Sequence, residues 1–521
     1  MSAGRTIIES MFDALPIDLP DLPDADDPTV AAAIAGWARI EAAAAARRLA
    51  AIAELTARRA ETTTGRELWS CDDWDATAAE VAAALRISHG KASGQMYLAK
   101  SLRDRLPRIA ALFADGRLSA QLVSTISWHS ALIKDPDALG RVDSTLAGDA
   151  LRYGPMSATK TAAAIDAIID RHDPGALRQT RASSRCRDLV VDTRESRHGT
   201  TPLWGRLYAH DATALDRRLM RMAHEVCDDD PRTVAQRRAD ALGALAAGRD
   251  RLVCGCGSPQ CPPATEVAPG SAGAVIHVLA DAATMDTPVD NHNSGQHPLP
   301  PTGDLSLTDP PLPEPDRPAT TAPPALLLGG PPIPAPLLAE LIRNGATVRP
   351  VWLPDPADPP ETGYRPSARL DEFVRLRDMT CRFPGCDHPA EFCDVDHTIA
   401  YGDGGWTHPS NLKVLCRKHH LLKTFWTGWR DVQYPDGTVE WTSPTGRVYT
   451  TNPGSRLLFP RLCRPTGRLP ATAPRPRPGG GRAMMMPLRK RSRCQDRAHR
   501  IDGERNLNAA HVAERNQPPP F

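Results

Sequence analysis

The sequence has few aromatic residues and no excess of charge of either sign, and both absences narrow the classes of protein that it fits. Phe, Tyr and Trp make up 5% of the 521 residues, and 63 basic residues nearly balance 62 acidic ones. A net charge of +1 excludes a polycation that binds nucleic acid over its whole surface, so any such surface must be local. The length is enough for more than one domain with its own core.

Long apolar runs are also missing from the sequence. No stretch reaches the roughly 20 apolar residues that a membrane-spanning helix needs. Residues 1–27 become acidic within a few positions and contain no apolar segment typical of a secretory signal. We therefore expect a cytoplasmic protein with no membrane partner. Its 12 cysteines should stay reduced, as buried thiols or metal ligands rather than disulfides.

Helical periodicity dominates the N-terminal half. It predicts helices over residues 27–60, 108–115, 119–133 and 230–248. Thr77 and Glu80 form a capping-box pattern ahead of the sequence VAAALRI. Residues 78–102 faintly resemble a helix-turn-helix with its turn at 88–90, but two core helices of an Ala-rich bundle are the favoured interpretation.

The composition changes in the C-terminal half. Residues 285–336 are rich in Pro and weakly charged, which predicts an extended or disordered linker. A short helix is expected after it, and residues 429–451 predict a small antiparallel meander with turns at PDG and PTG. Beyond Pro460 the chain is rich in Arg and Pro, with a net charge of roughly +10, which predicts a disordered tail attracted to phosphates or simply solvated.

Metal-capable side chains are densest between residues 381 and 420. Cys381 and Cys386 flank a Pro-Gly turn, and Cys416 and His419 lie one helical turn apart. Two such pairs about thirty residues apart suit tetrahedral Zn²⁺. Unrelated buried thiols with a surface His are the alternative, and either His388 or Cys393 could replace one of the four.

Four further polar residues in this segment remain outside the predicted zinc site: Asp396, His397, Asn411 and His420. On a helix, His420 points about 100° away from His419 and can face a different cleft. Asp396 is a hard oxygen ligand of the kind that Mg²⁺ prefers, and His397 points to the opposite side of an extended segment. The glycine-rich GDGG allows the chain to turn back, so that Asn411 can return to the same place.

These residues carry a resemblance to a known family. The segment resembles the HNH endonuclease motif, a ββα-metal module, through the DH of DVDH, the N of SNL, the last H of CRKHH and the flanking zinc pairs. The fragments YRPSARLDEFVRLRDMTCRFPGC, DPRTVAQRRADAL and CGCGSPQC resemble HNH proteins of GC-rich bacteria that carry a long N-terminal helical domain of unknown function.

The resemblance implies a role for each matching residue. It makes His397 the general base, Asp396 and His420 the ligands of one catalytic divalent cation such as Mg²⁺, and Asn411 a residue that orients the His397 segment. Phosphodiester cleavage needs a deprotonated water and charge stabilisation on the phosphate, which these groups supply. The zinc held by the Cys/His set would be structural.

The implied architecture is a mainly α N-terminal domain, a Pro-rich linker, a small α+β module of the ββα-metal HNH type followed by a short β-meander, and a disordered basic tail. The predicted boundaries are 1–27 (disordered), 28–284 (helical domain), 285–336 (linker), 337–455 (HNH module with meander) and 456–521 (tail). The helical domain is a candidate for self-association.

Two further residue sets are ambiguous. Arg417, Lys418 and Lys423 lie on the helix after the predicted zinc ligands and either bind phosphates or form a solvated face. Cys254, Cys256 and Cys261, with His277 as a guessed fourth ligand, form either a second zinc site or, as the favoured alternative, reduced thiols in a loop.

The complete set of catalytic residue types favours a metal-dependent DNA endonuclease with DNA as its partner. The alternative is a module that binds nucleic acid or protein without turnover and keeps only the structural zinc.

Overall fold

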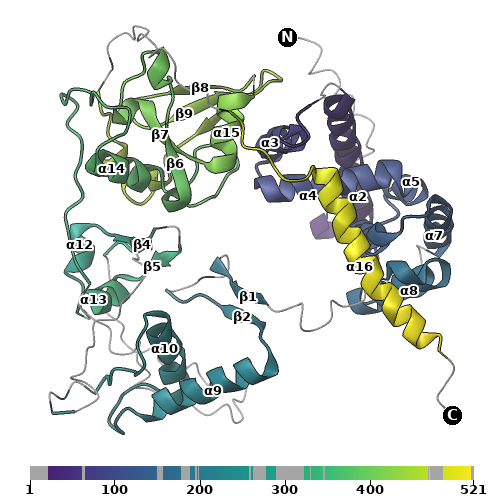
Figure 1. The fold of residues 1–521 in the computed structure, drawn as a ribbon, viewed down its shortest axis with the longest axis horizontal. Helices are drawn as coiled ribbons and strands as arrows, with labels where there is room; N and C mark the ends of the chain where they lie inside the picture. Colours follow the sequence, from purple (N-terminus) through teal and green to yellow (C-terminus); the bar gives the residue numbers. More distant parts are fainter. Residues whose placement is uncertain are drawn as a thin grey trace. The chain divides into compact units, whose positions relative to one another are not determined.

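The chain forms two compact units (Figure 1). One comprises residues 1–81, 90–179 and 488–521, and the other comprises residues 82–89 and 180–487. The division near residue 180 lies inside the range predicted as one helical domain. The computed structural model describes residues 22–61, 65–149, 156–177, 188–193, 196, 199–256, 258, 260–261, 277–288, 322–328, 330–343, 346–426, 428–467, 469 and 485–517.

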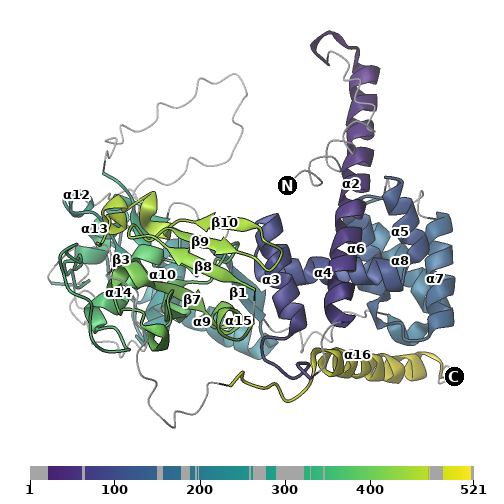
Figure 2. The same cartoon turned by 90° about the horizontal axis from the view of Figure 1, so that it is seen from above.

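The first unit is helical, as the periodicity predicts. Its elements are η1 (Leu22–Asp24), α2 (Asp27–Glu61), α3 (Asp73–Leu85), α4 (His89–Asp104), α5 (Pro107–Ala114), α6 (Ala120–His129), η2 (Ser130–Leu132), α7 (Pro136–Asp149), α8 (Ala158–His172), η4 (Pro174–Ala176) and α16 (Arg493–Arg515). Helices α2, α5, α6, α7 and α8 pack against one another (Figure 2). Their buried apolar residues, among them Ile109, Phe113 and Val142, form the core.

The start of α3 differs from the predicted capping box. Helix α3 begins at Asp73, so Thr77 lies inside it and donates its hydroxyl to the carbonyl of Asp73. Asp72 provides the N-terminal cap instead, because its carboxylate accepts the amide of Asp75 at 3.0 Å. Glu80 pairs with Arg59 at 2.8 Å, and burial raises the pKa of Glu80 despite this arginine.

The tail, predicted to be disordered, contains the helix α16, and the prediction is wrong for this part. Arg493 contacts Asp72 at 3.0 Å and Asp75 at 2.9 Å, and Arg505 contacts Asp173 at 2.8 Å. The two carboxylates of Asp72 and Asp75 are almost completely buried, so the arginines neutralise charges that burial makes costly. The rest of the basic tail from residue 470 to 484 lies outside the described residues.

The second unit combines short helices with small antiparallel sheets. Its N-terminal part contains β1 (Asp188–Val191), β2 (Leu203–Arg206), α9 (Ala209–His224), α10 (Val234–Ala246), β3 (Val278–Leu279), α12 (Ala282–Met285), β4 (Ala325–Leu327), β5 (Pro332–Ile333) and α13 (Ala335–Arg343). Strand β4 pairs with both β3 and β5. Residues 325–327 and 332–333 were predicted as linker but form β4 and β5, because Ala325 and Ile333 are buried with Leu338 of α13. Residues 289–321 of the predicted linker lie outside the described residues.

The C-terminal part of this unit contains a hairpin, a helix and a meander. Its elements are α14 (Ala368–Asp378), η8 (Ala390–Phe392), β6 (Cys393–His397), η9 (Tyr401–Asp403), η10 (Pro409–Asn411), β7 (Leu412–Cys416), α15 (Arg417–Phe425), β8 (Arg430–Gln433), β9 (Val439–Thr442), β10 (Val448–Thr451), η11 (Gly454–Arg456) and η12 (Pro460–Cys463). Strands β8, β9 and β10 form the predicted meander (Figure 2). Gly437 and Gly446 adopt positive φ at the PDG and PTG turns.

Two buried charges hold α14 against the hairpin. Arg377 donates to the carbonyls of Pro409 and Leu412 at 2.8 and 2.7 Å, and also contacts Asp378 at 2.8 Å. Asp378 accepts the amide of Val414 at 2.9 Å. Both charged side chains are excluded from solvent, so each depends on the other for compensation.

We expect Asp378→Ala to destabilise this region by about 3–5 kcal/mol, because it leaves Arg377 buried without its carboxylate. Amide hydrogen exchange of β7 in the full chain measures the loss as a lower opening free energy. Asp371→Ala is the control, since its pair with Arg375 is partly exposed and should contribute about 1 kcal/mol or less. Equal exchange in the two variants would contradict the role of Asp378.

In the part of the chain that the structure describes, helices long enough to cross a bilayer are too polar to do so.

Candidate functional site

The strands β6 and β7 and the helix α15 belong to one segment, which we call the ββα unit (residues 393–425; Figure 1). It contains the predicted residues Asp396, His397, Asn411, Cys416, His419 and His420, and Cys381 and Cys386 precede it. The two strands pair antiparallel, with Cys393 opposite Cys416, Asp396 opposite Lys413 and His397 opposite Leu412. Helix α15 starts directly after β7 and packs on both strands. The side chains of Asp396 and His397 leave the strand in opposite directions, as expected for successive strand residues.

His397 lies in a polar and aromatic setting at the end of β6 and is 6% exposed. Its Nε2 lies 2.9 Å from the Oγ1 of Thr407, and the Thr407 hydroxyl donates its only proton to the carbonyl of Gly363 at 2.6 Å. The hydroxyl must therefore accept from Nε2, which carries a proton. The ring of Tyr364 stacks on the imidazole with centroids 5.5 Å apart.

Asn411 holds the loop that follows His397. Its amide group donates to the carbonyls of Trp406 at 2.8 Å and Ile399 at 3.1 Å, and its Oδ1 accepts the amide of Ile399 at 2.8 Å. The loop turns back at GDGG, where a Cβ on Gly405 would lie 1.8 Å from the Ile399 carbonyl oxygen. The structure thus brings Asn411 to the His397 segment, as the sequence predicts.

Asp396 lies in a buried network of charges. Its Oδ2 contacts Lys423 at 2.6 Å and Lys413 at 3.4 Å, and both lysines also contact Asp431. Burial opposes ionisation of Asp396, but the Lys413 and Lys423 ammonium groups hold its pKa below its usual value. The carboxylate is therefore ionised at neutral pH, as a metal ligand must be.

His420 faces Asp396 from α15. Its Nε2 lies 3.5 Å from the Oδ1 of Asp396, and its Nδ1 lies 2.8 Å from the Oδ2 of Asp394. Because a carboxylate only accepts, Nδ1 donates its proton to Asp394, and this contact turns Nε2 toward Asp396. This pair of ligand atoms could hold a divalent cation.

The four predicted zinc ligands meet at one point: Cys381, Cys386, Cys416 and His419. Their ligand atoms all lie within 4.8 Å of one another, so the structure confirms that this set could hold a metal ion. His419 turns its Nδ1 toward the sulfurs of Cys416 at 3.3 Å and Cys381 at 3.5 Å.

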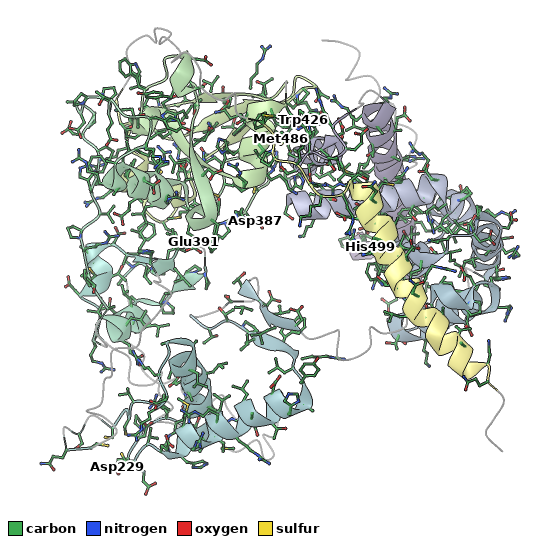
Figure 3. All side chains as sticks on the ribbon, in the orientation of Figure 1. Asp229, Asp387, Glu391, Trp426, Met486 and His499 are labelled. Carbon is green, nitrogen blue, oxygen red and sulfur yellow. The ribbon has the colours of Figure 1, made fainter. Side chains whose placement is uncertain are left out.

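Local geometry explains how the cluster forms. Gly385 has a φ of +76°, and the amide of Cys386 donates to the carbonyl of Phe383, which gives the predicted Pro-Gly turn. Asp387, the residue after this turn, is labelled in Figure 3. The Phe383 ring stacks on His419 with centroids 4.1 Å apart and keeps the cluster dry. The thiol of Cys381 points at Cys416 and lowers the pKa of the Cys416 thiol.

The two spare candidates lie outside this set. Cys393 lies opposite Cys416 in the hairpin, and its sulfur approaches the carbonyl of Pro389 at 3.3 Å. His388 is exposed next to Phe392.

The three residues predicted to bind phosphate have different surroundings. Arg417 is exposed and contacts Asp394 at 3.2 Å, and Lys418 is half-buried. Lys423 points inward, where its ammonium donates to Asp396 and to the carbonyls of His397 and Thr398. We therefore correct the prediction for Lys423, since an ammonium turned into the unit is not presented to a flanking phosphate.

A second cysteine set lies in the N-terminal part of the second compact unit. Cys254, Cys256 and Cys261 come together with Cys227, and the four sulfurs lie within 4.8 Å of one another. Cys227 takes the place that the sequence analysis gave to His277. The turn between α9 and α10 that carries Cys227 is marked in Figure 3 by Asp229.

Several residues that shape these sites were not predicted: Cys227, Tyr364, Asp394, Thr407, Lys413 and Asp431. Asp394 had a signal in the sequence, because it lies two residues before Asp396 and so shares its face of the strand. The other residues contact the sites from across a turn or from a different helix or strand, so the sequence near each site contains no pattern that indicates them.

The chain belongs to the family described as "Domain of unknown function (DUF222)", which matches residues 37–378. The ββα unit lies beyond this segment, whereas Cys227, Cys254, Cys256 and Cys261 lie inside it. Uncharacterized protein Rv2100 of Mycobacterium tuberculosis (strain ATCC 25618 / H37Rv) is 57% identical over 530 residues, which cover 100% of this chain and 95% of that protein.

A second relative from the same strain, Uncharacterized protein Rv3776, is 55% identical over 516 residues, 98% of this chain and 95% of its own length. A further M. tuberculosis protein, "Uncharacterized protein in est 3'region", is 53% identical over 369 residues, 70% of this chain and 100% of its own length. No solved structure matches the chain.

Proposed function

We propose that this protein is a metal-dependent endonuclease of the HNH type that hydrolyses phosphodiester bonds in DNA. The observation that carries the proposal is the meeting of Asp396 and His420 at one face of the ββα unit, with His397 following Asp396 on β6. A separate Cys/His set joins Cys416 and His419 of this unit to Cys381 and Cys386, which precede it. Chemistry and structural support are thus assigned to different residues.

His397 is the general base in this proposal. The Thr407 hydroxyl fixes the proton of the neutral ring on Nε2, so Nδ1 is the nitrogen that takes a proton from the attacking water. Histidine suits this role, because an unperturbed imidazole gains and loses its proton near physiological pH. Stacking by Tyr364 and the loop anchored by Asn411 hold the ring in place.

Asp396 and His420 are the ligands of the catalytic cation. Their facing atoms, Oδ1 and Nε2, are 3.5 Å apart, a separation compatible with two bonds of about 2.1 Å to one Mg²⁺-like ion. The cation supplies charge stabilisation for the phosphate and the leaving oxygen when it is bound. Asp394 positions His420 by accepting its Nδ1 proton.

Cys381, Cys386, Cys416 and His419 hold a structural Zn²⁺. The set offers three sulfurs and one imidazole nitrogen within 4.8 Å, and the four residues leave no position for a substrate in a tetrahedral arrangement. Zinc at this point joins the Pro-Gly turn to the start of α15.

One observation favours a second candidate function, a module that binds DNA without cleaving it. The ammonium of Lys423 lies 2.6 Å from the Oδ2 of Asp396 and already supplies a positive charge there. A protein in which a lysine neutralises Asp396 in place of a catalytic cation would not polarise a phosphate, and it would bind DNA through other groups.

Plasmid cleavage with and without chelator separates the two candidates. The endonuclease is expected to nick supercoiled DNA in Mg²⁺ or Mn²⁺ and to stop when EDTA is added, with products whose ends can be mapped. DNA retention without cleavage in either cation would favour the binding module.

Asp394→Asn is expected to raise the Mg²⁺ concentration needed for half-maximal cleavage by about 10–100-fold, because it removes the charge that orients His420. Titration of cleavage rate against Mg²⁺ measures the shift, and the rate at saturating Mg²⁺ should change little. Asp387→Asn is the control, since Asp387 is an exposed carboxylate just before the ββα unit. An unchanged Mg²⁺ requirement in Asp394→Asn would remove Asp394 from this role.

A further inference from the structure

The second cysteine set lies outside the proposed nuclease site and inside the family segment. Cys227 follows α9 directly, and Cys254, Cys256 and Cys261 lie in the loop after α10. Cys254 and Cys261 are buried, and Cys227 and Cys256 are half-buried. Four thiols from two separate stretches of chain therefore converge on one point.

The sulfur geometry suits a single metal ion. Sulfurs bound to one ion at about 2.3 Å lie about 3.8 Å apart in a tetrahedron, and all four here lie within 4.8 Å of one another. The sulfurs of Cys227 and Cys254 are 3.3 Å apart, well beyond the roughly 2.05 Å of a disulfide bond. All four residues are free thiols.

A polar clasp next to the cysteines holds the two stretches together independently. The carboxylate of Asp230, buried beside Cys227, accepts the amide of Gly255 at 2.8 Å and the guanidinium of Arg232 at 2.7 Å. Arg232 also donates to the carbonyl of Val253 at 2.7 Å. Val253 and Gly255 flank Cys254, and Asp230 lies beside Cys227. These hydrogen bonds therefore hold Cys227 and Cys254 near each other without a bound ion.

The apolar core around the thiols is small. It contains Met222, Val226, Ala241, Ala244 and Leu252, with the sulfurs of Cys254 and Cys261 at its centre. Alanine contributes little apolar area, so such a core stabilises a helix pair weakly. Small cores of this kind are commonly completed by a metal or by disulfides.

We propose that Cys227, Cys254, Cys256 and Cys261 form a tetrathiolate Zn²⁺ site that fastens α9, α10 and the following loop. Four protein ligands complete a tetrahedral site, so its role is structural. We favour zinc because four thiolates around one tetrahedral ion fit the spacing of the sulfurs. Four protein ligands also leave no position for a substrate. The site belongs to the family segment and does not depend on the nuclease proposal.

Metal analysis of the full-length protein tests the site. The natural chain should carry about two zinc ions, one in each cluster, and Cys227→Ser and Cys254→Ser should each carry one fewer. Cys494→Ser is the matched control and should keep both, because Cys494 is exposed and lies in neither cluster. Cys416→Ser should remove the other ion and leave this one.

A second measurement keeps the test decisive if Cys227→Ser fails to fold. Cobalt substituted into the natural chain should give the absorption bands of a tetrathiolate ion together with those of a site with three sulfurs and one nitrogen. One zinc per chain, lost in Cys416→Ser and retained in Cys227→Ser, would overturn the proposal. Iron in place of zinc at Cys227, or a Cys227–Cys254 disulfide in freshly purified protein, would also overturn it.

Discussion

His397→Ala is expected to slow DNA cleavage by about 10²-fold or more while the protein stays folded and keeps binding DNA. The substitution removes the proton acceptor but leaves Asp396, His420 and the Cys/His set in place. Single-turnover cleavage of a plasmid at saturating Mg²⁺ measures the chemical step, and a filter or gel-shift assay measures DNA binding. The substitution should therefore lower the rate of DNA cleavage and leave the affinity for DNA unchanged.

His388→Ala is the matched control, because His388 is an exposed imidazole of the same region and touches none of the proposed catalytic residues. Its rate should equal that of the natural protein. If His397→Ala cleaved as fast as the natural protein, the assignment of His397 as base would be wrong. If neither cleaved DNA in any divalent cation, the binding module would become the better interpretation.

Short-range spacing made much of the candidate site predictable from the sequence. Cys381 and Cys386 are joined by a turn that Pro and Gly specify, and Cys416 and His419 by one helical turn, so local geometry was enough to bring each pair together. The meander was predictable for the same reason, since alternating strands and two PxG turns determine its register.

Contacts between distant segments could not be predicted in this way. Cys227 lies 27 residues before Cys254 with a complete helix between them, so no motif joins the two. Arg493 of α16 looks like solvated charge in the sequence, but its carboxylate partners Asp72 and Asp75 lie more than 400 residues away. Composition counts charges without showing which of them are paired.

Lys423 shows the same limit within a single helix. Its spacing on α15 identified it as a basic residue near the site, but the direction of its side chain depends on Asp396 and Asp431 from two other elements. Burial lowers the pKa of Lys423, with Lys413 adding to this effect, while the two carboxylates oppose it. Only the tertiary contacts therefore decide whether such a lysine is exposed at the surface or turned into the core.

His419→Ala and His420→Ala are expected to fail in different ways although the two residues are adjacent. His419 directs Nδ1 toward two cysteine sulfurs, so its loss should remove zinc from this cluster and unfold the ββα unit. His420 faces Asp396, so its loss should leave that zinc bound and the unit folded. Cleavage by His420→Ala should still fall by about 10²-fold or more, because cation charge contributes several kcal/mol to the transition state.

Three measurements on the full chain separate the two outcomes: zinc content, amide exchange of β6 and β7, and cleavage rate across a Mg²⁺ and Mn²⁺ titration. His420→Ala should keep the natural zinc content and exchange protection, and excess Mn²⁺ should restore part of its activity. His419→Ala should lose one zinc and the protection of both strands, and no added cation should restore cleavage. If the zinc were lost in His420→Ala and retained in His419→Ala, the two histidines would have exchanged roles and the ligand sets would have to be reassigned.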